Sequence, residues 1–156
     1  MKRVMMILLL CAGVFALHAQ EVSFKNGMYY TADGKLFSGQ FTQFFTNGAK
    51  KCDVAVNNGK ANGTAVYYFE SGNKKESGNF VDGLRDGMWE SWNDAGVKTT
   101  EANYKMGKKD GQWIVWDDAG NKRMEMHYTD DQKTGTWKMW DDKGVQTGER
   151  KYSDAQ

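Results

Sequence analysis

Residues 87–110 read GMWESWNDAGVKTTEANYKMGKKD, and residues 111–134 read GQWIVWDDAGNKRMEMHYTDDQKT. Both stretches begin with a glycine, carry a tryptophan two steps later and carry a second tryptophan five steps later. The glycine recurs every 24 residues from Gly39 onward. A short, fixed period of this kind indicates a repeat protein, in which each unit buries its apolar side chains against its neighbours.

Two series of glycines mark the period. The first series opens the units, at Gly39, Gly63, Gly87, Gly111 and Gly135. The second follows nine residues later, at Gly48, Gly72, Gly96, Gly120 and Gly144. The repeat therefore divides the chain into five units, at 39–62, 63–86, 87–110, 111–134 and 135–156. The residues before them, 20–38, are interpreted as a starter or capping hairpin with a turn at Ala32-Asp33-Gly34.

Each unit contains two short runs rich in aromatic and β-branched residues, separated by turn sequences such as Thr-Asn-Gly and Asp-Ala-Gly. Such runs between turn residues are typical of strands joined as hairpins. The links are too short for a crossover, so neighbouring strands must be antiparallel. The chain has no proline to interrupt a strand ladder. The sequence predicts an all-β fold, an elongated single-layered meander of repeated hairpins, with a closed barrel as the alternative.

Aromatic side chains recur at two positions of the unit and are the candidate binding residues. They are Trp89, Trp92, Trp113, Trp116, Trp137 and Trp140, with Phe41 and Tyr68 at equivalent positions in the weaker first units. The two positions lie on opposite faces of the sheet if the strand alternates strictly. A bulge after the first tryptophan would instead bring both to one face.

Equivalent rings in successive units lie two strands apart, which is roughly 9.6 Å. That spacing is close to the repeat of an extended disaccharide, so the rings could stack on sugars or on the apolar side chains of a protein partner. Aromatic neighbours on adjacent strands also stabilise a sheet by about 0.2–1 kcal/mol per pair. The sequence leaves structural and binding roles open.

The N-terminus has the parts of a secretory signal peptide. Lys2 and Arg3 precede the apolar stretch VMMILLLCAGVFALHA, and we expect cleavage after Ala19. An uncleaved anchor is one alternative, and lipoprotein processing at Cys11 is another. The predicted location is therefore the periplasm, the cell envelope or the exterior.

Cleavage would change the formal charge from +1 to −1, because residues 1–19 contain two cationic and no acidic side chains. A chain so close to neutral gives no electrostatic case for binding nucleic acid, and none for more than weak membrane association. Cys52 would be the one remaining cysteine, so no intrachain disulfide could form.

No convergent set of catalytic residues is evident. Cys52 and His127 occupy equivalent strands three units apart, which is roughly 29 Å in an open sheet, whereas a nucleophile–base pair needs contact at about 3 Å. Acidic residues recur before the turn glycines, at Glu70, Asp94, Asp118 and Asp142, doubled by Asp117 and Asp141. Aspartate favours such turns because its side chain hydrogen-bonds to the backbone of the turn. We expect the row of acidic residues to be neutralised by Lys50, Lys74, Lys98 and Lys122. The sequence predicts no enzyme, no cofactor and no metal site.

The unit pattern G-x-W-x-x-[WY]-x-x-x-G-x-[KR] resembles the variant MORN repeats of bacterial proteins, often labelled YwqK-like antitoxins. The stretches YKMGKKDGQWIVWDDAGNK (104–122) and FVDGLRDGMWESWNDAGVK (80–98) carry the resemblance, which extends over residues 37–152. It implies β-hairpin repeats and a role in protein or membrane-associated interactions. An immunity role against an envelope-acting toxin would be compatible with export.

We therefore predict an exported, non-enzymatic scaffold that binds an unknown protein partner in the cell envelope through its tryptophan rows. The alternative is a glycan or cell-wall binding module that uses the same rings. The last strand, about 146–152, is predicted to be an uncapped edge where another strand could pair.

Overall fold

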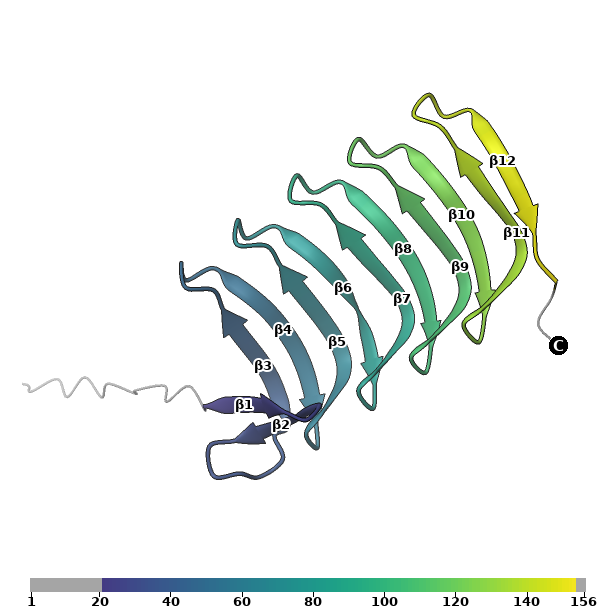
Figure 1. Ribbon diagram of the computed structural model, residues 1–156. Coiled ribbons are helices and arrows are strands. Elements are labelled where there is room, and N and C mark those ends of the chain that lie inside the picture. The colour runs from purple at the N-terminus through teal and green to yellow at the C-terminus, as the bar shows by residue number, and fades with distance from the viewer. Residues whose placement is uncertain (1–20, 154–156) are drawn as a thin grey trace, which may run out of the picture.

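The computed structural model describes residues 21–153, which form twelve β-strands and no helix. Ten of the strands make one open sheet in which each strand pairs antiparallel with the next along the chain (Figure 1). The predicted elongated all-β meander is confirmed, and the sheet does not close into a barrel. No helix long and apolar enough to cross a membrane occurs in the described part of the chain. The proposed signal peptide and Cys11 lie outside the described residues.

The strands fall into a small hairpin and the main sheet. The hairpin consists of β1 (Val22–Lys25) and β2 (Met28–Thr31). The main sheet consists of β3 (Gly39–Phe44), β4 (Lys50–Asn57), β5 (Lys60–Tyr68), β6 (Lys74–Val81), β7 (Leu84–Trp92), β8 (Lys98–Lys105), β9 (Lys108–Trp116), β10 (Lys122–Thr129), β11 (Gln132–Trp140) and β12 (Gln146–Lys151).

Two-residue turns join the strands at one end of the sheet. In the turn between β4 and β5, Asn58 and Gly59 both have positive φ, at 47° and 77°. This backbone suits the type I′ turn, whose twist matches that of the strands it joins. The fourth unit places Asp131 at φ 69° where the first three units have glycine. Its carboxylate compensates in part by accepting a hydrogen bond from the Lys109 backbone N–H at 2.8 Å.

The opening glycines of the last four units, Gly63, Gly87, Gly111 and Gly135, lie in β-bulges. Between β6 and β7 the register passes from Asn79↔Asp86 to Ser77↔Glu90, so the bulge gathers Gly87, Met88 and Trp89 opposite a single residue of β6. Gly87 supplies the positive φ of 70° that this bulge requires. A bulge bends its strand and increases the local twist, in keeping with the curved strands in Figure 1.

The two tryptophans of a unit lie on opposite faces of the sheet. On β7, Trp89 pairs with Ala102 of β8 and Trp92 pairs with Lys98. The register shift between these pairs skips a residue of β8, not of β7. The three-residue offset on β7 therefore turns the second ring away from the first. This settles the question that the sequence left open.

The β1–β2 hairpin packs on the face that carries Trp89. Tyr29 of β2 stacks on Phe41 with ring centroids 5.0 Å apart, and its backbone N–H donates to the Gly59 carbonyl at 2.8 Å. Figure 1 shows the hairpin across the first strands of the main sheet. We call this side of the sheet the hairpin face, and the side that carries Trp92 the opposite face.

The turn expected at residues 32–34 is present, and the residues on either side of it form a bridge between Tyr30 and Leu36. A second turn at Asn26-Gly27, which joins β1 to β2, was not expected. The expectation that the hairpin caps the edge was wrong, because β1 and β2 form a separate sheet and leave the edge of β3 unpaired. It therefore covers part of a face and does not cap the edge. The strand β12 is the other edge, as predicted, and a strand-pairing role for it stays a prediction.

The apolar core lies on the hairpin face, in two clusters. One is covered by the hairpin and consists of Tyr29, Phe37, Cys52, Val54, Val56, Ala61, Ala65 and Trp89. The other lies further along the sheet and consists of Met126, Tyr128 and Trp137. The second cluster is buried by neighbouring side chains of the same face, because no second layer of described residues lies over it.

Candidate functional site

The structure divides the predicted binding residues between the two faces. Phe41, Trp89, Trp113 and Trp137 lie on the hairpin face, and Tyr68, Trp92, Trp116 and Trp140 lie on the opposite face. The predicted set of binding residues therefore consists of two separate rows, and each row has its own neighbours.

The hairpin face carries a continuous row of five aromatic rings beyond the hairpin. Each ring contacts the next, with centroids 4.9–5.4 Å apart. In order along the sheet the rings are Tyr104, Trp113, Tyr128, Trp137 and Tyr152. We call these five residues the ring row. Tilted and edge-on contacts at this separation are the favourable arrangements for aromatic pairs.

Hydrogen bonds to the backbone fix the tryptophans of this face. The indole N–H of Trp113 donates to the Asn103 carbonyl at 2.9 Å, and that of Trp137 donates to the His127 carbonyl at 3.0 Å. Trp89 makes the same bond with Asn79. The rings are therefore held in one orientation, as a preformed surface requires. Trp89 and Trp137 are buried and Trp113 is half-buried.

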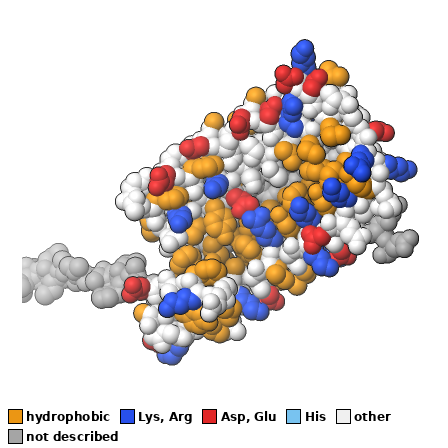
Figure 2. Space-filling model, viewed as in Figure 1, with side chains coloured by type: hydrophobic (Ala, Val, Ile, Leu, Met, Phe, Trp, Pro, Cys, Tyr) orange, Lys and Arg blue, Asp and Glu red, His pale blue; other side chains and the backbone are white. Residues whose placement is uncertain are grey.

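A cation lies over each tryptophan of the hairpin face. The guanidinium of Arg85 is 4.1 Å from the centre of the Trp89 ring, and the ammonium groups of Lys109 and Lys133 are 4.5 and 4.7 Å from Trp113 and Trp137. These distances are typical of cation–π contacts. Figure 2 shows basic side chains among hydrophobic ones on the side of the molecule in view. On the surface that a partner meets, cations therefore lie outermost, with half-buried rings between them.

Sequence reasoning missed these cations. They stand two residues before the opening glycine in three units, so a periodic signal was present at Arg85, Lys109 and Lys133. The signal is easily overlooked, because charges of both signs alternate along the strands. The cation and the following tryptophan are four residues apart, so strict alternation already places them on the same face. Only the bulge at the glycine between them was not visible from the sequence.

Three lysines of the opposite face, Lys50, Lys98 and Lys122, pair with carboxylates, whereas Lys74 has no ion pair among the described residues. Lys98 lies between Glu90 and Glu101, and Lys122 pairs with Glu125 at 2.9 Å. Lys122 also lies over the ring of Trp140, 5.1 Å from its centre. The expectation that these lysines neutralise the acidic turn row was wrong, since their partners lie on the strands. The opposite face therefore presents rows of rings and lysines whose charge is largely balanced.

The acidic residues at the turns stabilise the turns by accepting hydrogen bonds. The carboxylate of Asp117 accepts hydrogen bonds from the backbone N–H groups of Ala119 and Asn121, at 3.0 and 2.9 Å. These bonds hold the pKa of Asp117 below its usual value. Within residues 21–153, no three His, Cys, Asp or Glu side chains gather as a metal-ligand set.

Cys52 and His127 lie on β4 and β10, six strands apart in the sheet. Cys52 is buried beneath the hairpin, and this burial raises the pKa of its thiol. A raised thiol pKa lowers the fraction of the reactive thiolate. The two residues therefore form no nucleophile–base pair.

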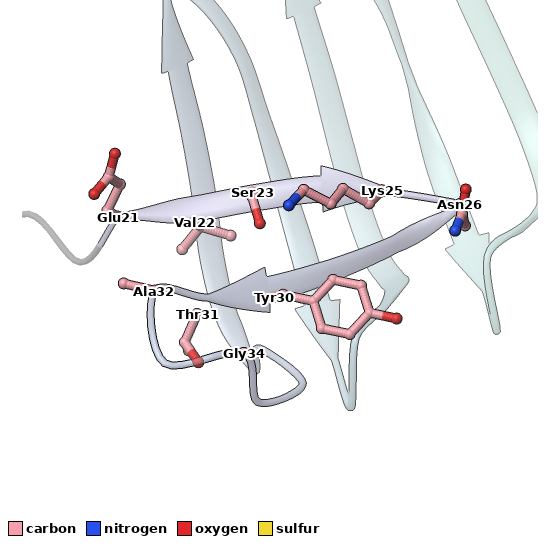
Figure 3. A pocket seen from close by; sticks show the side chains of 9 residues that line it. All are labelled: Glu21, Val22, Ser23, Lys25, Asn26, Tyr30, Thr31, Ala32 and Gly34. Atoms are coloured by element: carbon pink, nitrogen blue, oxygen red, sulfur yellow. The ribbon is translucent and has the colours of Figure 1, made fainter.

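A shallow hollow lies along the β1–β2 hairpin (Figure 3). Val22, Tyr30 and Ala32 supply its apolar lining, and Glu21 and Lys25 are its charged residues. This lining has no set of nucleophile, base and orienting group, so the hollow is a weaker candidate for a site than the ring row.

Comparison with known proteins supports the repeat interpretation. The family described as MORN repeat variant matches residues 61–82. The chain is also similar to a solved structure described as the Glycosylation Associate Protein (Gap123) complex from Streptococcus agalactiae, at 12% identity and a TM-score of 0.38. That similarity covers 67% of this chain and 19% of the other, so this chain spans about a fifth of the length of that one. No curated protein matches the chain.

An all-β repeat fold that carries a MORN repeat variant suggests a protein-binding scaffold. Modules of this kind are generally binding repeats and not catalytic ones.

Proposed function

We propose that this protein is an exported, non-enzymatic scaffold that docks a protein partner on the hairpin face of its last three units. The docking surface consists of the ring row and the cations Lys109, Lys133 and Arg150. An immunity function would be the particular case in which the partner is an envelope-acting toxin.

One observation carries the proposal: a polypeptide segment already occupies the first part of the same face. Tyr29 of the β1–β2 hairpin stacks on Phe41, and the hairpin also hydrogen-bonds to the backbone at Gly59. The aromatic and apolar side chains of this face continue through β8–β12, where no described segment covers them. The hairpin thus provides an example, within the chain, of what the face accepts.

The arrangement of the rings favours a protein partner over a neutral glycan. Sugar binding by stacking needs an open ring face, but Lys109 and Lys133 lie over Trp113 and Trp137. Lys74 and Lys122 lie over Trp92 and Trp140 on the opposite face in the same way. A glycan would have to displace these cations, whereas a polypeptide can pair with them and pack between them.

The proposal is tested by blocking one face at a time with a neutral polymer. Val115 pairs with Thr100 and Met124 on the hairpin face, while its neighbour Ile114 pairs with Glu101 and Glu125 on the opposite face. Val115→Cys and Ile114→Cys, each in a Cys52→Ala background, would be coupled to maleimide-polyethylene glycol. Each would then be compared for proteins co-purified from the envelope fraction of cells that express the protein.

We expect the polymer at Val115 to remove the partner and the polymer at Ile114 to leave it bound. The neutral polymer adds no charge, so the test concerns only access to the face. Retention of every partner with Val115 blocked, or an equal loss with Ile114 blocked, contradicts the docking surface.

Export has its own test. Cleavage after Ala19 predicts that intact-mass measurement on the protein purified from its own cells finds a chain that begins at Gln20. A chain that retains Met1 or Lys2 in the cytoplasmic fraction contradicts export.

A further inference from the structure

The cations of the hairpin face differ in one respect: among the described residues, only the first has an acidic partner. Arg85 pairs with Glu76, whose carboxylate Oε2 lies 2.9 Å from the guanidinium Nη2. Within residues 21–153, no ion pair forms to Lys109, Lys133 or Arg150. Within the described residues, the positive charge of the hairpin face is therefore balanced at Arg85 and unbalanced over the docking surface.

The repeat shows which group is missing. Glu76 stands thirteen residues after its opening glycine, and the equivalent residues of the next two units are Thr100 and Met124. Thr100 pairs with Ser91 and Val115, and Met124 pairs with Val115 and Met139, so both side chains lie on the hairpin face. The cation is thus retained from unit to unit while its carboxylate is replaced by uncharged side chains.

We propose that a bound partner supplies these carboxylates, and that the occupant is an acidic, proline-rich segment in the polyproline II conformation. This inference rests on the proposed function and specifies the chemistry of the partner. Charge-assisted hydrogen bonds between carboxylate and ammonium groups are among the stronger polar contacts.

The spacing of the cations selects the conformation. Lys109 and Lys133 occupy equivalent positions two strands apart, which is roughly 9.6 Å. A polyproline II helix has three residues per turn and rises about 3.1 Å per residue, so every third side chain lies on one side at intervals of about 9.3 Å. An acidic residue at every third position would therefore meet successive cations along the row.

The surface between the cations suits proline. Segments in this conformation dock on surfaces lined with aromatic side chains. Partly exposed apolar groups lie between and beside the cations. They are the half-buried rings of Tyr104, Trp113 and Tyr152, and Met139, which is 39% exposed. Acidic side chains would pair with the lysines and draw them off the ring faces, which a neutral glycan cannot do, and proline rings would then pack on these apolar groups.

The experiment measures fluorescence anisotropy of a labelled peptide of six Glu-Pro-Pro repeats on the purified protein. A Lys-Pro-Pro peptide of the same length and the anionic polysaccharide polygalacturonate serve as comparisons. Thr100→Glu and Met124→Glu, made together, place a carboxylate beside each lysine in imitation of Glu76. The matched control is Ser77→Glu, because Ser77 pairs with Glu90 on the opposite face.

We expect saturable binding of the Glu-Pro-Pro peptide, no binding of the Lys-Pro-Pro peptide, and a loss of about tenfold or more in affinity in the double variant, because its own carboxylates compete for the lysines. The Ser77→Glu control should bind as the unmodified protein does. Glu76→Gln should strengthen binding, because it frees Arg85. Lys109→Gln with Lys133→Gln should repeat the loss without adding a charge, which keeps the test valid if the glutamate variants fold poorly.

The proposal is overturned if the Glu-Pro-Pro peptide does not bind the unmodified protein at millimolar concentration. It is also overturned if the peptide binds the double variant and the lysine variants as tightly as it binds the unmodified protein. Binding of polygalacturonate alone, with the same sensitivity to substitution, would overturn it in favour of an acidic glycan. If the polymer at Val115 removes the natural partner but the Thr100 and Met124 substitutions do not, only this inference fails. If neither affects any partner, the proposed function fails with it.

Discussion

Replacing Trp89 by alanine is expected to lower the free energy of unfolding by about 3–5 kcal/mol, the usual cost of removing a large buried aromatic side chain. Trp89 is 1% exposed, the most buried ring of the chain's described part. It contacts Phe80 with ring centroids 4.8 Å apart and lies beneath the Arg85 guanidinium. Its loss would leave a cavity and deprive the Asn79 carbonyl of the indole hydrogen bond.

The matched variant is Trp92→Ala, which removes the same side chain three residues away on the opposite face. Trp92 is only half-buried, and the side chain that lies over its ring is the solvent-exposed Lys74. We expect a cost of about 1 kcal/mol, in the range of a surface aromatic pair. Urea denaturation followed by circular dichroism measures both values. Equal costs for the two variants would contradict the assignment of the core to the hairpin face.

Replacing Gly78 by alanine is expected to destabilise the fold by about 1–3 kcal/mol, as overpacking in a tight core does. A Cβ at this position would lie 2.2–2.5 Å from three atoms of the Trp89 ring. The ring would have to shift and would disturb its contact with Phe80. An alanine also reduces the entropy of the unfolded chain, which favours folding by about 0.4–1 kcal/mol. The steric cost is the larger of the two.

Gly148→Ala is the control for this substitution. A Cβ there would meet only the flexible end of Met139, at 3.1 Å. Chemical denaturation of the two variants should therefore show a clear loss for Gly78→Ala and a change near zero for Gly148→Ala. A neutral or stabilising effect of Gly78→Ala would mean that the Trp89 ring does not lie against the backbone of β6.

The order and direction of the strands were predictable because the signals for them are local. The second glycine of each unit closes a turn with positive φ, as Gly72 and Gly96 do at 91° and 82°. Links of a few residues allow only antiparallel neighbours. The meander therefore follows from turn chemistry repeated at a fixed interval, without knowledge of long-range contacts.

The faces were less predictable because they depend on where the register shifts. The opening glycine appeared to be only a marker of the repeat, whereas Gly87 and Gly111 occupy bulges with φ of 70° and 102°. A bulge is a property of two paired strands, so a single strand's sequence does not reveal it. The cations of the hairpin face were missed although Lys109 and Lys133 recur in phase, each four residues before a tryptophan.

The position of the β1–β2 hairpin depended on tertiary packing. Its residues break the period, and this was taken to indicate a cap for the edge strand β3. The aromatic ring of Tyr29 instead contacts Phe24 of the hairpin and Phe41 of the hairpin face, where Tyr29 becomes buried. Burial of apolar surface contributes about 25 cal/mol per Å², and no local pattern indicates where it will occur.

The central claim is that the hairpin face of the last three units binds a protein. The most direct measurement is photo-crosslinking in intact cells, with the photoreactive residue p-benzoylphenylalanine placed at Val115 in one strain and at Ile114 in another. These neighbours lie on β9 and face opposite sides of the sheet. The account predicts a discrete protein adduct from position 115 and none from position 114. Adducts from position 114 alone, or from neither position, would contradict it.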